Sequence, residues 1–111
     1  MKLSVEPGTI FHSQGVIAVE YPVLDAREID GVVVVVFDYM AFPRLAPARN
    51  MFGYSVADGE QLWRASDIGQ GNVDAYTNVL SETPLVVGNF AGFACGIDLN
   101  TGSVISTVFT K

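Results

Sequence analysis

The side chains that most often carry catalysis are scarce in this 111-residue chain, which holds one histidine, His12, and one cysteine, Cys95. A single histidine cannot share a metal ion with a second one, and no Gly-x-Ser-x-Gly sequence presents a nucleophilic serine. Cys95 lies in the apolar segment 93–97, where no cationic neighbour in the sequence stabilises a thiolate. We therefore expect Cys95 to pack as a small apolar side chain and His12 to be an ordinary exposed or hydrogen-bonded residue.

Two pairs of carboxylates and one pair of glycines are further candidates for a catalytic or ligand-binding role. The first carboxylate pair, Asp58 and Glu60, flanks an expected turn, and the second, Asp67 and Asp74, flanks an expected loop. Paired carboxylates can bind cations or act as acid and base, but aspartate is also favoured in turns on conformational grounds. The segment 69–71 begins like a dinucleotide-binding fingerprint, yet Asp occupies its last position and a strand is expected to follow. We expect no catalytic residue, no metal ligand and no cofactor, and an enzyme that uses Asp or Glu alone is a remaining alternative.

Composition limits the class of protein. Twelve acidic residues against six basic ones give a net charge of −6, which argues against a surface that binds nucleic acid. The longest apolar run, Val32 to Phe37, is much shorter than the about 20 residues of a membrane-spanning helix. The first eight residues also lack the apolar run of a signal peptide. We therefore expect a soluble, cytoplasmic protein without nucleic-acid or membrane partners.

Strand signals dominate the chain. Five consecutive valines, 32–36, are branched at Cβ and favour a strand whose two faces are both covered. Only 23–29 could hold one or two helical turns. We expect one all-β domain over 1–111, a single antiparallel meander of about seven to nine short strands that follows an N-terminal hairpin at about 9–21. The main strands are expected at 31–39, 50–57, 60–65, 74–80, 85–90, 93–99 and 103–110.

An internal echo relates two of these hairpins. Residues 52–59 align with residues 95–102 at an offset of 43 positions, and both glycines of each segment coincide. A period of about 40 to 50 residues is typical of propeller blades. Each segment therefore belongs to an expected blade-like unit, the first at about 31–65 and the second at about 74–110.

The first segment resembles the blade hairpin of quinoprotein-type β-propellers, whose repeat reads Ala-x-Asp-x-x-Thr-Gly-x-x-x-Trp. Here Gly53-Tyr-Ser-Val-Ala-Asp-Gly-Glu-Gln-Leu-Trp63 shares the Gly and the Trp of that pattern, while Gly96 to Gly102 matches its middle and Ser106 replaces the Trp. The resemblance covers about 30–65 and 84–110. It implies that Trp63 packs between blades, and it implies no cofactor ligand. Because a propeller typically has 4 to 8 blades, one chain is too short to form one.

A loop between two expected strands is the first candidate binding site. The first repeat is longer than the second, and the extra residues fall between Met40 and Arg49. Arginine and aromatic residues are typical anchors of interaction surfaces, and the two prolines of this segment reduce the entropy lost on binding. The candidate residues are Met40, Phe42, Arg44 and Arg49. The alternative is a loop that caps the open end of the sheet with its apolar side chains.

Polar and aromatic residues in the expected strands form a second candidate, a cleft between strands. Asparagine is disfavoured in strands, so its side chain either satisfies backbone groups at bulges and strand ends or lines a polar pocket. The candidate residues are Trp63, Tyr76, Asn78 and Asn89.

These observations favour a non-catalytic interaction protein with a protein partner. A more specific expectation is an acidic inhibitor or immunity-type protein, whose charge of −6 would speed its encounter with a basic enzyme. We also expect self-association, with a homodimer as the simplest closed form, because an open meander leaves edge strands unpaired. The alternative function is small-ligand binding in the cleft.

Overall fold

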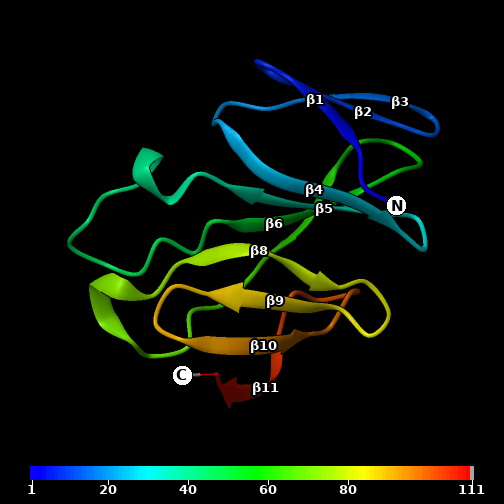
Figure 1. Cartoon of the computed structure of the whole chain (residues 1–111). Helices are drawn as coiled ribbons and strands as arrows, with labels where there is room; N and C mark the ends of the chain where they lie inside the picture. The colour runs from blue at the N-terminus through cyan, green and yellow to red at the C-terminus, as the bar shows by residue number, and fades with distance from the viewer. Residues whose placement is uncertain (111) are drawn as a thin grey trace.

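The structure, a computed structural model, describes residues 1–110, which form eleven strands in three antiparallel sheets (Figure 1). The N-terminal sheet contains β1 (Ser4–Glu6), β2 (Thr9–His12) and β3 (Gly15–Ala18). The central sheet contains β4 (Val23–Ile29), β5 (Val32–Phe37), β6 (Met51–Ser55) and β7 (Gln61–Arg64). The C-terminal sheet contains β8 (Tyr76–Ser81), β9 (Val86–Asn89), β10 (Phe93–Ile97) and β11 (Val104–Phe109).

The remaining regular elements are two single turns of 3-10 helix. The first, η1, spans Tyr39–Ala41, and the second, η2, spans Gly71–Val73. Among residues 1–110, no helix is long and apolar enough to span a lipid bilayer. The expected all-β class with almost no helix is therefore confirmed.

The central sheet is covered on both faces. Side chains alternate along β5, so Val33 and Val35 pack with Ile10 of the N-terminal sheet, whereas Val34 packs with Val87 of the C-terminal sheet. All five valines of β5 are at most 5% exposed. The continuous apolar run thus predicted correctly that both faces of this strand are buried. Because one sheet packs on each face of the central sheet, the fold has three layers.

The expectation of a single meander is wrong. Each four-stranded sheet is a meander of its own, and β7 and β8 lie in different sheets. Residues 23–29, the segment whose sequence could hold one or two helical turns, form β4, because pairing with β5 from Val23–Phe37 to Ile29–Val32 outweighs their weak helix propensity. The short β1, which pairs with β2, was also missed. Neither meander closes into a propeller.

The 43-residue echo falls on equivalent strands. β6 and β10 are the third strands of their sheets, and β7 and β11 are the fourth. Gly53 lies opposite Trp63, and Gly96 lies opposite Ser106. A Cβ atom on Gly53 would overlap the rigid indole ring of Trp63, so this position requires glycine, whereas a Cβ atom on Gly96 would overlap only the Ser106 hydroxyl oxygen, which would have to rotate away. The Nε1 atom of Trp63 donates to the carbonyl of Leu99 at 2.7 Å, which joins the central sheet to the C-terminal sheet.

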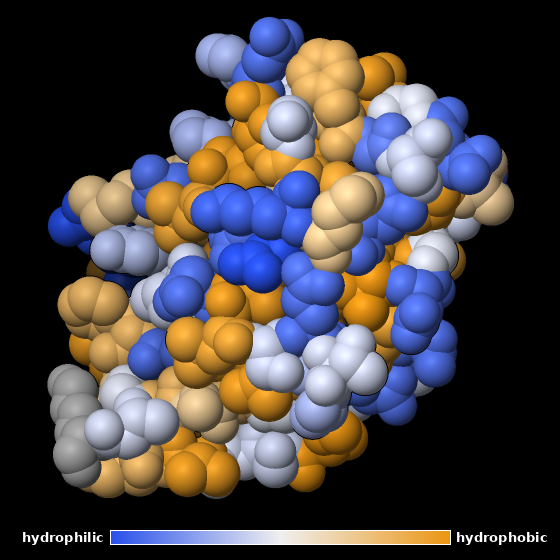
Figure 2. All heavy atoms as spheres, turned by 45° about the vertical axis from the view of Figure 1, so that its right-hand side comes forward, coloured by the Kyte–Doolittle hydropathy of each residue, from blue (hydrophilic) through white to orange (hydrophobic). Residues whose placement is uncertain are grey.

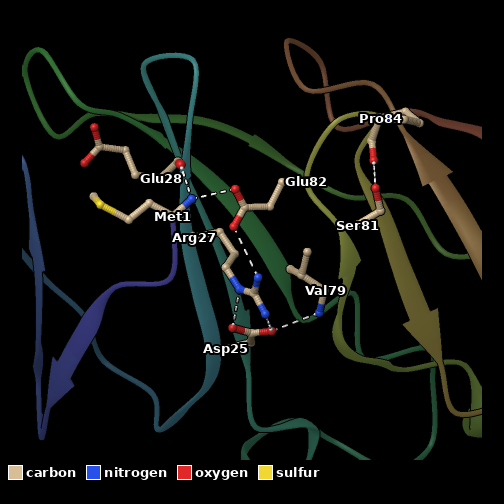
Figure 3. A network of polar contacts seen from close by, with 8 residues as sticks. All are labelled: Met1, Asp25, Arg27, Glu28, Val79, Ser81, Glu82 and Pro84. Carbon is tan, nitrogen blue, oxygen red and sulfur yellow. Dashed lines mark hydrogen bonds and ion pairs between the residues drawn. The ribbon is translucent and has the colours of Figure 1, made fainter.

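A partly buried ion-pair network also joins these two sheets (Figure 3). The carboxylate of Asp25, on β4, accepts hydrogen bonds from Arg27 at 2.9 and 3.2 Å and from the backbone N–H of Val79 at 3.0 Å. The register of β8 shifts at Val79, which leaves this N–H free to point towards Asp25. Arg27 donates in turn to Glu82 at 3.2 Å. Burial by itself would raise the pKa of Asp25, but the hydrogen bonds from Arg27 and Val79 outweigh it and lower the pKa.

We predict that Asp25→Asn lowers the free energy of unfolding at pH 7 by about 1–3 kcal/mol, because the Arg27 guanidinium loses its charged acceptor. The folded-state pKa of Asp25 is lowered, so its stabilising contribution is present above the unfolded value of 3.8 and is lost as the pH falls through the folded value. The variant should therefore lose less stability than the wild type below about pH 4. Urea unfolding between pH 2 and 7 measures both effects.

The matched control is Asp58→Asn, which removes a carboxylate from an exposed turn that makes no ion pair with residues 1–110. It should change stability at pH 7 by less than about 0.5 kcal/mol. An equal loss from both variants would contradict the role of the network.

Candidate functional site

An apolar hollow lies where the loop between β5 and β6 meets the C-terminal sheet. Its volume is about 210 Å³. The loop begins with η1, whose N-terminus is capped by Asp38 as its carboxylate accepts from the N–H of Met40 at 2.9 Å. One wall is formed by Met40, Phe42 and Arg44 of this loop, and the other wall includes Val73, Ala75 and Phe90. We call this feature the apolar hollow.

The structure brings together three of the four residues expected to form a binding loop. Met40, Phe42 and Arg44 line the apolar hollow, whereas Arg49 does not. Arg49 adopts a left-handed backbone conformation with φ of 47°, and its Nε atom donates to the carbonyl of Ala65 at 3.2 Å. It therefore holds the base of the loop. Phe42 also packs on Tyr21 with ring centroids 4.6 Å apart, so the loop both covers the end of the core and forms the hollow.

A buried asparagine fixes the two walls relative to each other. The Asn50 side chain is fully buried; its Nδ2 atom donates to the carbonyls of Phe37 at 2.6 Å and Tyr76 at 2.8 Å. Its Oδ1 atom accepts from the N–H of Tyr76 at 2.8 Å. A nearby backbone bond from Ala48 to Asp74, 3.1 Å long, joins the same two segments. The amide of Asn50 thus connects the central sheet to β8 in the way that a neighbouring strand would.

Sequence reasoning missed Asn50. It lies at the start of an expected strand, 50–57, whose pattern does not set it apart. The available signal was its type, because asparagine is disfavoured inside strands unless its side chain satisfies backbone groups.

Asp74 lies between Val73 and Ala75, which line the apolar hollow, and it fixes this wall by hydrogen bonds. Its carboxylate is 2% exposed and accepts from the N–H groups of Ile68 at 2.7 Å and Gln70 at 3.1 Å, and from Asn89 at 3.0 Å. These bonds organise the loop that leads into η2. Within residues 1–110, no three His, Cys, Asp or Glu side chains lie close enough together to hold a metal ion.

The residues of the expected cleft line neither the apolar hollow nor the second hollow described below, although Tyr76 and Asn89 are paired between β8 and β9. Trp63 and Tyr76 are buried between the sheets, and the Tyr76 hydroxyl donates to the carbonyl of Ser66 at 2.5 Å. Asn89 is buried and bound to Asp74, whereas Asn78 is exposed and accepts from the Thr77 hydroxyl at 3.0 Å. Asn89 also accepts from the backbone N–H of Ala91 at 2.9 Å, which is the backbone-satisfying role expected for an asparagine at a strand end, whereas Asn78 contacts a side chain.

The single cysteine and the single histidine of the sequence both lie away from the apolar hollow. Cys95 is fully buried, and burial raises the pKa of its thiol to about 11, so the thiol stays protonated at neutral pH. His12 lies at the end of β2, where its Nδ1 atom accepts from the N–H of Gln14 at 3.2 Å. Neither residue lines the apolar hollow.

A second hollow of about 570 Å³ lies between the β1–β2 turn and the segment that enters β4. Its lining includes Glu6, Glu20 and Tyr21. Sequence analysis did not single out any of these residues, because they are separated in the chain and follow no recognised motif.

We predict that Asn50→Ala lowers the free energy of unfolding by about 2–5 kcal/mol, because each buried polar group left without a partner costs about 1–3 kcal/mol. Urea unfolding gives the free energies. Asn78→Ala, at an exposed strand position, is the matched control and should stay within about 0.5 kcal/mol of wild type. If the two variants lose the same free energy, Asn50 does not fix the walls.

Comparison with known proteins adds a family and no function. A domain family described as a domain of unknown function, DUF7957, matches residues 4–109. None of the curated proteins compared with the chain matches it. The match covers all three sheets and the apolar hollow, and the chain therefore belongs to the DUF7957 family.

Proposed function

We propose that this protein is a non-catalytic binding protein whose apolar hollow takes an apolar side chain from a protein partner. The observation that carries the proposal is the set of apolar side chains exposed around the hollow. Met40 is 56% exposed, Val73 is 47% exposed and Phe90 is 57% exposed. Leu45, on the same loop, is 97% exposed. Contiguous apolar surface of this kind is typical of interaction sites.

The size of the hollow favours a protein side chain over a small molecule. Pockets for small ligands usually measure about 300–1,000 Å³, and the apolar hollow, at about 210 Å³, is smaller. A space of this size suits one or two side chains that anchor a larger contact surface.

Arg44 supplies a polar contact at the rim. Its guanidinium donates to the sulfur of Met40 at 3.2 Å and forms no ion pair with residues 1–110. It is therefore available to a carboxylate or a backbone carbonyl of the partner. Arginine beside exposed aromatic and methionine side chains is the composition typical of interface anchors.

The hollow is also preformed. The Asn50 amide and the Ala48–Asp74 bond hold its two walls together. Pro43, in the lining, restricts the backbone of the loop. A rigid site loses less conformational entropy on binding, so more of the contact energy contributes to affinity.

The more specific proposal, an acidic inhibitor of a basic protein, is supported by charge. Asp30, Asp58 and Glu60 lie on turns at the end of the central sheet opposite the apolar hollow. Figure 2, in which that side comes forward, shows hydrophilic side chains gathered over it. The net charge of −6 would speed encounter with a basic partner, and the hollow would then supply the anchoring contact.

One observation favours the second candidate function, small-ligand binding. The hollow beside Glu6, Glu20 and Tyr21, at about 570 Å³, falls within the range of small-ligand pockets. Two carboxylates and an aromatic ring would suit a small organic cation. A rise in melting temperature with such a ligand, abolished by Glu20→Gln, would support this alternative.

We predict that p-benzoylphenylalanine in place of Phe90 crosslinks one protein in native cell extract, through an apolar residue identified by mass spectrometry. With that protein purified, Arg44→Ala should raise the dissociation constant measured by calorimetry about tenfold, as expected for an interface anchor. The same crosslinker in place of Phe11 is the control, because Phe11 is 40% exposed but lies on β2.

Three results would overturn the proposal. Equal crosslinking from Phe11 would show that the apolar hollow is not selective. Adducts with small molecules alone would favour the second candidate function. An unchanged dissociation constant for Arg44→Ala would remove the assigned anchor.

A further inference from the structure

We infer that β11 pairs with β11 of a second copy of this chain, so that two C-terminal sheets join edge to edge about a two-fold axis. This inference goes beyond the proposed function, because it concerns a different part of the surface. It rests on the contrast between β11 and every other sheet edge of residues 1–110.

The other edge strands are protected. Residues 1–3 cover the outer edge of β4, where the N–H of Leu3 donates to Ala26 and the N–H of Glu28 donates to Met1, both at 2.9 Å. The register of β8 is interrupted twice, and its Val79 N–H is taken by Asp25. Bulges and covering segments are the usual protection of sheet edges against unwanted pairing.

The remaining protected edges are short. In the N-terminal sheet, β1 has three residues and β3 has four. In the central sheet, β7 has four residues and ends at the charged Arg64. Short strands and charged side chains both weaken pairing with another chain.

Edge strand β11 is protected least: its one irregularity is a register shift at Ile105, and Ser106 to Phe109 pair regularly with β10. It is six residues long, it pairs only with β10, and five of its six residues are exposed. Its sequence, Val-Ile-Ser-Thr-Val-Phe, contains no charge and no proline. Most of its residues are β-branched or aromatic, which favours strand pairing. An uncharged, exposed edge of this length presents free N–H and C=O groups that a further strand would satisfy.

Apolar side chains accompany this free edge. Ile105 is 67% exposed, and Val108 and Phe109 are each 60% exposed. Figure 2 shows hydrophobic side chains reaching the surface along the lower part of the molecule, where Figure 1 places β10 and β11. Pairing would cover part of this apolar surface as well as the backbone groups.

A second copy of the chain suits this edge for two reasons. An antiparallel pair of identical strands is self-complementary, so a two-fold axis at Thr107 places the two Thr107 residues opposite each other and Ser106 opposite Val108, all within the regular part of β11. Threonine pairs are favourable across strands. Because β11 is uncharged, the net charge of −6 places no carboxylate on the joined strands.

The assembly would also stop at two copies. Each chain contributes its least protected edge among residues 1–110, and the far edge of each C-terminal sheet is β8, whose register is interrupted twice. The product is a closed pair with one continuous sheet of eight strands, two sets of four.

The test is the solution mass of the full chain, measured by size exclusion with light scattering. As the concentration rises over about 100-fold towards 1 mM, the wild type should move from 11.9 kDa towards twice that mass. Ile105→Lys combined with Val108→Lys should shift the dimerisation constant by at least tenfold towards monomer, because lysine on an edge disfavours pairing.

The matched control is Leu62→Lys. Leu62 occupies in β7 the place that Ile105 occupies in β11, 43 positions later, and it is 48% exposed. This variant should dimerise like the wild type. Circular dichroism and melting temperature establish that all variants are folded, and crosslinking from Phe90 should be unaffected by either lysine substitution.

A wild type that stays at 11.9 kDa throughout would overturn the inference. So would masses that keep growing beyond two copies, or equal weakening by Leu62→Lys. If the double variant is unfolded, concentration-dependent hydrogen exchange in the wild type decides instead. Protection of the β11 amides must rise with protein concentration, and constant protection would reject the pairing.

Discussion

The hydrogen bonds of one buried side-chain amide, that of Asn50, hold together the end of the molecule that carries the apolar hollow. Asn50 bonds to both backbone polar groups of Tyr76 and to the carbonyl of Phe37. The two sheets do not share a ladder at this point, so a side chain has to supply the connection that strand pairing supplies elsewhere. Both walls of the apolar hollow, the long loop and the segment before β8, start from residues next to this amide. Its removal would expose unsatisfied backbone groups on both sides at once.

Patterns that depend on local chemistry could be predicted from the sequence. The five valines of β5 indicated a strand covered on both faces, and the glycine-containing turns placed the seven expected strands within a few residues of their observed bounds. The echo between Gly53 and Gly96 identified equivalent strands, because both glycines face a side chain of the next strand. These features follow from periodicity and from the small size of glycine, which are visible in a single sequence.

Features that depend on contacts between distant segments could not be predicted. Residues 23–29 have acceptable helix formers, and only the availability of β5 as a neighbour makes them a strand. Trp63 and Tyr76, expected beside a cleft, are buried in the core between the sheets. The loop was found by its composition and its excess length, and three of its four candidates line the hollow. Asn50 and the opposite wall were not found, since nothing in the sequence shows which strand their polar groups will meet.

The replacement of Trp63 by Ser106 in the second repeat changes what this position of the sheet contacts. In the central sheet, the indole ring lies over Gly53 on one side and contacts the Gly102 turn of the next layer on the other. At the equivalent place in the C-terminal sheet, a serine fills the space above Gly96 and extends no further. A side chain that reaches a turn of another sheet, as Trp63 does, is therefore absent at position 106. The same repeat position thus links two sheets in the first repeat and packs on a glycine of its own sheet in the second.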